Sequence, residues 1–301
     1  MSSYDTIKSF LTDIGCAYCC DEPMSRHTSF KIGGNADLFV TPENEQQASA
    51  IIKRCRELEI KYYLIGNGSN LLVSDEGLRG VVIAFTKAMG DITVCGNTIT
   101  AQAGALLSTV CRTACENNLS GMEFAFGIPG SIGGAIFMNA GAYGGEMKDI
   151  TVSVRALFPN GEIYELDAND VRFGYRMSIF QKNSAVILSA KFELKADDKA
   201  EIESRMNDIL QRRKDKQPLE WPSAGSAFKR PKDGFAAALI DECGLKGFTV
   251  GGAQVSEKHA GFVINRNNAT CKDVIELLGQ VKGVVFGKTG VLLEPEIKQL
   301  G

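Results

Sequence analysis

The sequence predicts a protein that mixes helices and strands along its whole length, and two observations lead to this prediction. Apolar residues recur at helical spacing in several segments, while short apolar runs such as residues 62–65 are typical of strands. Two glycine-rich runs, residues 66–72 and 127–135, interrupt these segments. Glycine lets backbone N–H groups approach an anion closely, so two such loops suit a dinucleotide better than a monophosphate.

The pattern in the first part of the chain predicts a leader helix followed by a β-α-β unit. The leader helix is predicted over residues 1 to about 20. Thr41 followed by Pro42 is typical of an N-cap and a first helical residue, so the next helix is predicted to begin there. The strand at 62–65 follows, and the unit is predicted to end near Ala84.

A second unit is predicted to begin at Ile92. It contains a helix around residues 106–114, the second glycine-rich run, and strands at 152–154 and 186–188. A charge-rich helix is then predicted over about 201–217, with its charges on a solvated face.

Prolines at the ends of residues 218–222 break the chain and indicate a domain boundary. Two further helices are predicted beyond it, over residues 233–243 and 270–281. Gly244 stands where a glycine commonly ends a helix.

The composition is that of an ordinary globular protein. The chain has 301 residues, 44% of them hydrophobic and 23% charged, and its net charge is −3. This net charge does not indicate binding to nucleic acid or to a membrane surface. No apolar stretch approaches the roughly 20 residues of a membrane span, and residues 1–11 lack the pattern of a signal peptide. We therefore expect a cytoplasmic protein with no membrane insertion.

Cysteine and histidine usage argues against metal or thiol-redox chemistry. Nine cysteines are an odd number in a chain too large to need disulfides, which is typical of a reducing compartment. The C-x-x-C at residues 16–19 has no second copy, and only His27 and His259 are available to complete a zinc site. Cys111 and Cys115 have the spacing of an ordinary amphipathic helix. We expect no metal site.

The loop at residues 66–72 matches neither common nucleotide-binding motif. A Rossmann fingerprint needs a third glycine where Leu71 stands and then a helix, whereas residues 71–75 predict a strand and a turn. A Walker loop needs Lys and Ser or Thr after Gly68, and the Gly-Lys-Thr at 287–289 lacks that motif's first glycine. The loop alone leaves two interpretations open, a phosphate cradle and a plain hairpin turn.

Three further features could carry chemistry, although each has a plain structural alternative. Arg176 lies among aromatic and aliphatic residues and needs an anion or a salt bridge, because an unpaired buried charge is costly. Small residues flank Ser226, which lets its hydroxyl approach a ligand but is also typical of a polar turn. Glu294 and Glu296 flank Pro295, which suggests a sheet edge or bulge where charges guard against aggregation.

These pieces occur in an order that resembles one family of enzymes. The ordered motifs are Gly-Asn-Gly-Ser-Asn at 66–70, the run at 130–135 with Asn-Ala-Gly-Ala-Tyr-Gly at 139–144, Tyr-Arg-Met-Ser at 175–178, Gly-Ser-Ala-Phe-Lys at 225–229 and Leu-Glu-Pro-Glu at 293–296. The segment 27–34 also matches the start of that family's flavin domain. From about His27 to its end, the chain resembles the UDP-N-acetylenolpyruvoylglucosamine reductases, FAD enzymes that make UDP-N-acetylmuramate for peptidoglycan.

The resemblance implies an α+β fold. It consists of an FAD-binding domain of the vanillyl-alcohol-oxidase (PCMH) type in two subdomains, residues 1–85 and 86–198, and a C-terminal α+β substrate domain over 199–301. No long insertion separates Tyr175 from Ser226, so the chain resembles the shorter class of the family, which lacks an extra substrate-capping segment.

The resemblance also implies FAD as cofactor and NADPH as co-substrate. Enzymes of this fold commonly attach FAD to a histidine near the first phosphate loop, and this loop has none, so we expect non-covalent FAD. The first loop is expected to hold the pyrophosphate, and the second loop with Asn139 to line the flavin. The cofactor-binding residues implied are Gly66, Asn67, Gly68, Ser69, Asn70, Gly130, Ser131, Gly133, Gly134, Ala135 and Asn139.

The catalytic residues implied by the resemblance are Arg176, Ser226 and Glu296. Hydride passes from the flavin to the methylene carbon of the substrate, Arg176 stabilises the charge driven into the adjoining carboxylate, and Ser226 protonates the other carbon. Serine is a very weak acid, and Lys229 is our candidate for the neighbour that polarises it. Glu296 is expected to act protonated, because burial disfavours the charged carboxylate. Tyr175 and Lys229 are expected to contact substrate.

Two rival functions belong to different classes. One is another flavoprotein of the same fold, such as an oxidase of hydroxy acids or sugars, against which the set Arg176, Ser226 and Glu296 argues. The other is a nucleotide-binding module without catalysis, which a visible spectrum of the protein would separate from both enzymes. We expect a UDP-sugar and NADPH as ligands, and no nucleic acid or obligatory protein partner.

Overall fold

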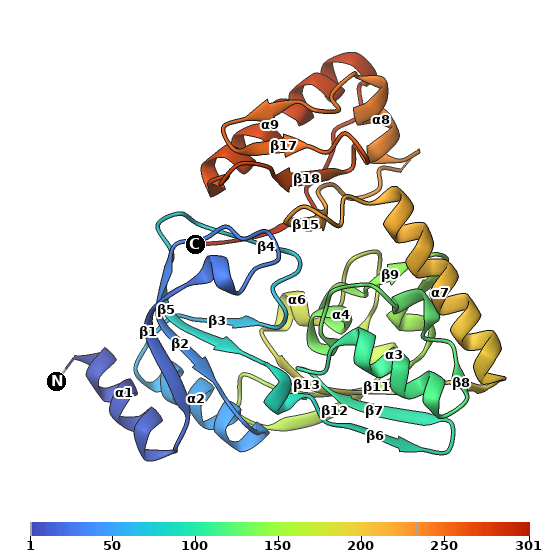
Figure 1. The fold of residues 1–301 in the computed structure, drawn as a ribbon. Coiled ribbons are helices and arrows are strands. Elements are labelled where there is room, and N and C mark those ends of the chain that lie inside the picture. Colours follow the sequence, from blue (N-terminus) through green and yellow to red (C-terminus); the bar gives the residue numbers. More distant parts are fainter. Residues whose placement is uncertain (1, 233) are drawn as a thin grey trace. The chain divides into compact units, whose positions relative to one another are not determined.

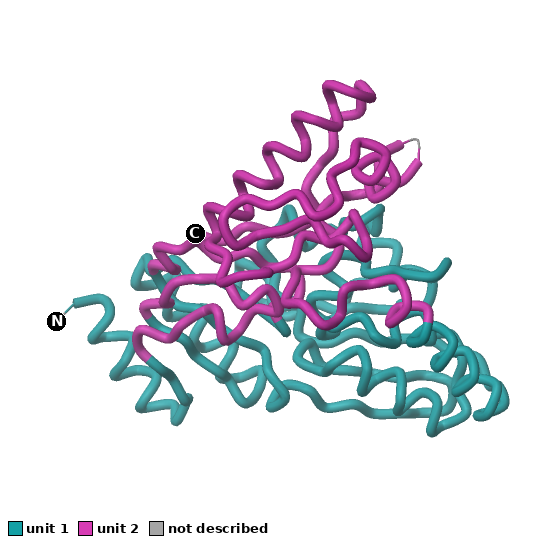
Figure 2. The backbone as a smooth tube through the Cα atoms, turned by 45° about the horizontal axis from the view of Figure 1, so that its top comes forward, with its two compact units in different colours: residues 1–19, 38–67, 80–211 teal, residues 20–37, 68–79, 212–301 magenta. Residues whose placement is uncertain are grey.

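The computed structural model describes residues 2–232 and 234–301 and divides the chain into two compact units, drawn in different colours in Figure 2. Unit 1 comprises residues 1–19, 38–67 and 80–211, and unit 2 comprises residues 20–37, 68–79 and 212–301. Each unit has a hydrophobic core of its own, with Phe192 fully buried in that of unit 1 and Phe30 in that of unit 2. Among the described residues, no helix has both the length and the apolar composition needed to cross a membrane.

The N-terminal part of the chain forms a four-stranded sheet in the order β1-β2-β5-β3 (Figure 1). Its strands and the helices between them are α1 (Ser3–Asp13), β1 (Ala17–Pro23), η1 (Met24–Arg26), β2 (Asn35–Thr41), α2 (Glu45–Glu57), β3 (Tyr62–Ile65) and β5 (Leu78–Ala84). The apolar face of α2, including Ile51 and Ile52, is fully buried in the core of unit 1. β3 pairs in parallel with β5, which completes the predicted β-α-β unit.

Unit 1 also contains an antiparallel five-stranded sheet in the order β12-β11-β13-β7-β6. The elements of this region are η2 (Lys87–Met89), β6 (Ile92–Cys95), β7 (Thr98–Gln102), α3 (Leu107–Glu116), β8 (Leu119–Ser120), η3 (Glu123–Ala125), α4 (Ile132–Met138), β9 (Gly141–Ala142), β10 (Gly145–Glu146), η4 (Met147–Asp149), β11 (Thr151–Leu157), β12 (Ile163–Asp167), α5 (Ala168–Val171), α6 (Phe180–Asn183), β13 (Val186–Glu193) and β14 (Lys195–Ala196). The short helix α4 packs on β13 and β7, so the sheet supports the second glycine-rich loop. The chain then enters α7 (Lys199–Lys216), which runs from unit 1 into unit 2.

Unit 2 contains an antiparallel sheet in the order β15-β18-β17-β16, with α9 packed on β16 and β17 (Figure 1). Its elements are β15 (Ser223–Ser226), α8 (Ala236–Glu242), β16 (Thr249–Val250), β17 (Ala253–Val255), β18 (Phe262–Asn265) and α9 (Cys271–Thr289). A separate parallel pair joins β4 (Leu71–Val73) to β19 (Lys298–Leu300). This pair brings the strand after the first glycine-rich loop to the C-terminal end of the chain.

Several helix ends differ from their predicted positions. The leader helix stops at Asp13 rather than near residue 20, because Gly15 turns the chain with φ +65° and β1 follows. α2 does not begin at Pro42: Thr41 ends β2, and the side chain of Asn44 caps the helix by accepting the N–H of Gln47 at 2.9 Å.

The two helices of unit 2 also differ in extent from the prediction. α8 is shorter than the predicted 233–243, of which Asp233 lies outside the described residues. α9 extends beyond residue 281 to Thr289 and ends at Gly290, where φ is +72°. The predicted cap at Gly244 is confirmed, with φ +72° and its N–H donated to Asp241 O at 2.8 Å.

Neutral His259 stabilises the turn between β17 and β18. Its Nδ1 accepts the N–H of Gly261 at 3.1 Å, and its ring meets Phe262 edge to face. Burial, with Lys246 and Lys216 nearby, lowers the pKa of His259 below its ordinary value of 6.5. The unfolded chain therefore takes up this proton first, and acid favours unfolding.

We expect His259→Asn to reduce the acid sensitivity of folding. Asparagine can still accept the N–H two residues on but does not titrate. The stability that neutral His259 provides is complete above pH 6.5 and is lost as pH falls through its lower native pKa. Thermal unfolding midpoints should therefore fall more steeply from pH 7.5 to pH 5 in the wild type than in the variant. Parallel curves for the two proteins would contradict this role.

Candidate functional site

The two glycine-rich loops meet within unit 1. A Cβ added to Gly66, directly after β3, would lie 2.1 Å from Ser131 Oγ, so a larger residue would clash with this hydroxyl. The amide of Asn67 donates to Pro129 O at 2.7 Å. Residues 66–67 of the first loop therefore lie directly against residues 129–131 of the second, as a dinucleotide held by both loops requires.

The rest of the first loop lies in unit 2, because the division between the units falls after Asn67. Gly68 has φ +61°, and a Cβ there would lie 1.9 Å from His27 O. The N–H of Ser29 donates to Gly68 O at 3.2 Å, so residues 27–29 pack against the loop. Glycine is required at this position on both conformational and steric grounds.

Ser131 carries a buried hydroxyl that forms no hydrogen bond with any described residue. The residue is 2% exposed and precedes α4, yet its side chain does not cap that helix. The N–H groups of Ile132 and Gly133 donate to Ala105 O and Ala103 O, both at 2.8 Å. The hydroxyl is thus an unsatisfied polar group beside Gly66, which is what a site completed by a polar ligand would show. This donor and the two glycine cradles fit FAD.

Asn139, by contrast, uses its side chain entirely within unit 1. It is fully buried with φ +42° at the end of α4. Its Nδ2 donates to Glu146 Oε2 at 2.9 Å and to Gly174 O at 3.0 Å, while its Oδ1 accepts the N–H of Lys148 at 3.0 Å. The side chain therefore organises the protein around it.

Arg176 lies at the tip of a tight turn from Gly174 to Met177. The N–H and C=O groups of those two residues bond to each other, and Arg176 has φ +53°. Its Nη2 donates to Gly141 O at 3.1 Å, and its guanidinium lies 5.1 Å from the ring centre of Tyr175. Tyr175 is half exposed, so an arginine and an aromatic ring share this turn.

A β-bulge presents Ser226 at the end of β15. The pairing with β18 shifts between Ser223 and Ser226, and Gly225 within the shift has φ +76°. Ser226 is exposed, although Ala224 and Ala227 on either side of Gly225 and Ser226 are buried. The small residues around Ser226 thus form the bulge that turns it outward.

Glu296 lies beside the strand end that carries Ser226. Its N–H donates to Ala227 O at 2.9 Å, and the N–H of Lys229 donates to Glu294 O at 2.8 Å. The Lys229 ammonium forms an ion pair with the Glu294 carboxylate, a partner that the sequence did not reveal. Asn70, predicted to bind cofactor, donates from its side chain to Glu296 O at 3.2 Å.

The units divide the predicted catalytic set. Arg176 belongs to unit 1, while Ser226, Lys229 and Glu296 belong to unit 2. Sequence reasoning missed Gln181, which donates to Arg176 O and to Phe137 O, both at 2.9 Å. No motif signalled it, because a glutamine near a helix start has no distinctive spacing.

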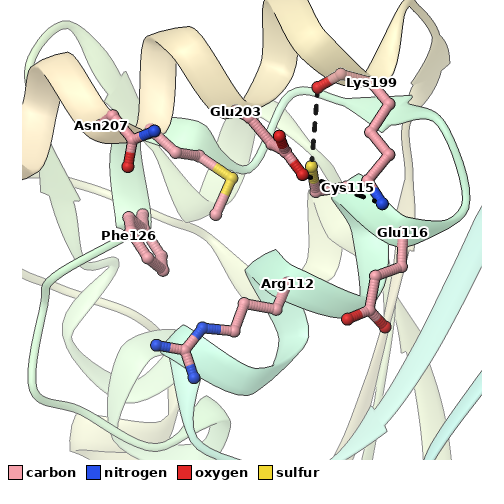
Figure 3. Close-up of a pocket in the computed structure, with 8 residues that line it drawn as sticks. Arg112, Cys115, Glu116, Phe126, Lys199, Glu203 and Asn207 are labelled. Carbon is pink, nitrogen blue, oxygen red and sulfur yellow. Dashed lines mark hydrogen bonds and ion pairs between the residues drawn. The ribbon is translucent and has the colours of Figure 1, made fainter.

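A hollow of about 300 Å³ between α3 and α7 contains none of the predicted site residues (Figure 3). Its lining residues are Arg112, Cys115, Glu116, Phe126, Lys199, Glu203, Met206 and Asn207. The Cys115 thiol donates to Lys199 O at 3.8 Å, and burial raises its pKa. Burial also raises the pKa of Cys111 to about 12, so both thiols stay protonated at neutral pH. In the described part of the chain, no three His, Cys, Asp or Glu side chains gather as metal ligands would.

Comparison with known proteins identifies both parts of the chain. Residues 36–167 match an FAD binding domain, and residues 217–300 match the UDP-N-acetylenolpyruvoylglucosamine reductase C-terminal domain. The UDP-N-acetylenolpyruvoylglucosamine reductase of Clostridium perfringens strain SM101 is 51% identical over 93% of this chain and 92% of its own. That of Clostridioides difficile strain 630 is 50% identical with the same coverage.

Solved structures agree with these matches. The crystal structure of the reductase from Thermus caldophilus superposes with a TM-score of 0.82 at 34% identity, covering 95% of this chain and 99% of that one. Physcomitrella patens BBE-like 1 shares the fold alone, with a TM-score of 0.50 at 14% identity over 63% of this chain and 44% of its own. The predicted α+β fold with an FAD-binding domain is confirmed.

We expect Gly66→Ala to destabilise the protein and Ser131→Ala to relieve that effect. The new Cβ would meet Ser131 Oγ at 2.1 Å but Ser131 Cβ only at 3.3 Å. Overpacking of this kind costs about 1–3 kcal/mol of unfolding free energy. Thermal unfolding should show a lower stability in Gly66→Ala and a recovered stability in the double variant. The flavin content of the double variant should nevertheless be low, because the Ser131 hydroxyl is gone. A double variant no more stable than Gly66→Ala would contradict the proposed clash.

Proposed function

This chain belongs to the UDP-N-acetylenolpyruvoylglucosamine reductase family, and we propose that it reduces the enolpyruvyl group of UDP-N-acetylenolpyruvoylglucosamine to give UDP-N-acetylmuramate. FAD is the carrier, which the match to an FAD binding domain supports, and NADPH is the electron donor that the family resemblance implies. The observation that carries the proposal is 51% identity to a named reductase over nearly the whole chain. The product serves peptidoglycan synthesis, and through it cell shape and division.

The apposed glycine-rich loops support FAD binding by this chain. Bound FAD supplies a hydride carrier that accepts electrons from NADPH and passes them to the substrate. Gly66 and Gly68 let the backbone approach the pyrophosphate, and the Ser131 hydroxyl gains the partner it lacks inside the protein. Asn139 contributes to this site through the residues it organises, since its amide is committed elsewhere.

Arg176 stabilises the negative charge that the reduction drives into the substrate carboxylate. A guanidinium already fixed by Gly141 O and Tyr175 needs little reorganisation when that charge develops. Ser226 delivers the proton to the neighbouring carbon, and Glu296, which is only partly buried, is the third catalytic residue. Because Lys229 is paired with Glu294, we assign Lys229 to substrate binding, together with Tyr175, rather than to polarising Ser226.

We further propose that residues 1–85 and 86–198 form the two flavin subdomains and residues 199–301 the substrate domain. All nine cysteines are free thiols, which supports a role in the reducing cytoplasm. UDP-sugar and NADPH are the expected ligands, without an obligatory protein partner.

We expect acid precipitation of the yellow protein to release all of its flavin. The two histidines of the chain are His27 and His259, and neither lies within residues 66–72. The backbone of His27 lies against Gly68, but the Nε2 atom of its ring bonds to Glu22 Oε1 at 2.9 Å. Absorbance of the supernatant near the flavin band should account for the colour of the native protein. Colour retained in the washed pellet would contradict non-covalent binding.

We expect Ser226→Ala to separate the two half-reactions. Ser226 only protonates the substrate, so flavin reduction by NADPH should stay near wild type. Reoxidation by the enolpyruvyl substrate should slow by about 10²–10⁴-fold, the usual size of a general-acid contribution. Stopped-flow absorbance measures each half separately, and Ser223→Ala in the same strand is the matched control. Equal slowing of both halves would exclude the proton-donor role.

A further inference from the structure

We propose that Gln181 and Asn139 form an amide clamp, a pair of positioning residues that holds the Arg176 turn in its working conformation. The clamp rests on the function proposed for Arg176. Gln181 is not among the residues expected to contact substrate or cofactor. Asn139 is expected from the resemblance to line the flavin, and its amide bonds to Glu146 and Gly174. Each acts through the backbone on either side of the arginine.

The two amides bond to two different carbonyls of the turn. Asn139 Nδ2 donates to Gly174 O at 3.0 Å, at the start of the turn. Gln181 Nε2 donates to Arg176 O at 2.9 Å, on the arginine itself. Each –NH₂ group has a second hydrogen, and both second hydrogens go to the segment that begins at the end of α4.

That segment, residues 137–146, is therefore the base of the clamp. Gln181 donates its second hydrogen to Phe137 O at 2.9 Å, and Asn139 donates its second to Glu146 Oε2 at 2.9 Å. The guanidinium of Arg176 reaches the same segment through Gly141 O at 3.1 Å. The turn is thus fixed to α4, whose other end carries the buried hydroxyl of Ser131.

The backbone hydrogen bonds between Gly174 and Met177 close the turn, and the amides add bonds that fix it to the neighbouring segments. Arg176 has φ +53°, a left-handed conformation that costs a non-glycine residue free energy. Tyr175 is 50% exposed and Met177 37%, so apolar burial does not anchor the tip. Ser178, fully buried and bonded to Phe137 O at 2.8 Å, fixes the chain only after the turn has ended. Without the amides, the turn would keep its own backbone bonds but lose the two bonds that fix it to the neighbouring segments, and the guanidinium would move.

The test is a double-mutant cycle in the flavin-loaded enzyme. Gln181→Met keeps the side-chain length and removes both donors. We expect it to slow reoxidation by the enolpyruvyl substrate about 10- to 100-fold, the cost of a misplaced catalytic group. Flavin content and the rate of reduction by NADPH should stay within about twofold of wild type. In an Arg176→Ala background, the same change should have no further effect on reoxidation.

Lys182→Met is the matched control, since it makes the same replacement at the next residue of α6, an exposed position. It should leave both half-reactions unchanged. Gln181→Glu is the second variant should Gln181→Met fold poorly: a charged carboxylate cannot donate, whereas its protonated form can donate to one carbonyl. Reoxidation by this variant, measured relative to wild type, should therefore recover as pH falls.

The outcomes separate the clamp from the function on which it rests. Wild-type reoxidation in Arg176→Ala would overturn both the role of Arg176 and the clamp. Slow reoxidation in Arg176→Ala with wild-type rates in Gln181→Met would overturn the clamp alone. An undiminished effect of Gln181→Met in the Arg176→Ala background, or equal slowing of both half-reactions, would also overturn it, because either result indicates a general structural defect.

Discussion

The parallel pairing of β4 with β19 is the constraint on which the site residues of unit 2 depend. It joins residues 71–73 to residues 298–300, so the segment 68–79 belongs with the C-terminal part of the chain rather than with its sequence neighbours. Because the strands are parallel, the residues that precede them lie at the same end of the pair. Asn70 therefore bonds through its side chain to Glu296 O and through its carbonyl to Lys298 N. A residue of the first glycine-rich loop and the backbone of Glu296, whose side chain is proposed to be catalytic, are thereby held together.

The short helix α4 has a comparable part in unit 1. Ser131, with its unsatisfied hydroxyl, precedes the helix, and Asn139, with its fully used amide, ends it. This helix of seven residues therefore connects the place where the glycine-rich loops meet to the turn that carries Arg176. The helix rests on β13 and β7 of the five-stranded sheet, so sheet packing sets the position of both ends.

The sequence predicted the glycine-rich loops but not the contacts between residues far apart in the chain. Gly66 and Gly68 could be recognised because glycine followed a strand; a Cβ at Gly68 would clash with the backbone of His27 and one at Gly66 with the hydroxyl of Ser131. The cap at Asn44 was missed because Thr41 followed by Pro42 is also the pattern of a helix start. In the structure Thr41 is the last residue of β2. The ion pair of Lys229 with Glu294 joins residues far apart in sequence, and no spacing rule predicts such a pair. The sequence did not indicate Gln181 for the same reason. Its side chain bonds to the backbone carbonyls of Phe137 and Arg176, which come close to it only in the folded chain.

Several of the non-glycine residues with positive φ in unit 1 lie near the arginine turn. Asn139, Tyr143 and Arg176 all have positive φ, and they lie in the two segments that the amides of Asn139 and Gln181 join. Each such conformation costs of order 1–3 kcal/mol and persists only where its surroundings determine it. A glycine at position 176 would remove that cost but also the guanidinium. An arginine kept in a glycine-like conformation, and held there by two buried or half-buried amides, indicates that the position of its charge matters more than the stability of its turn.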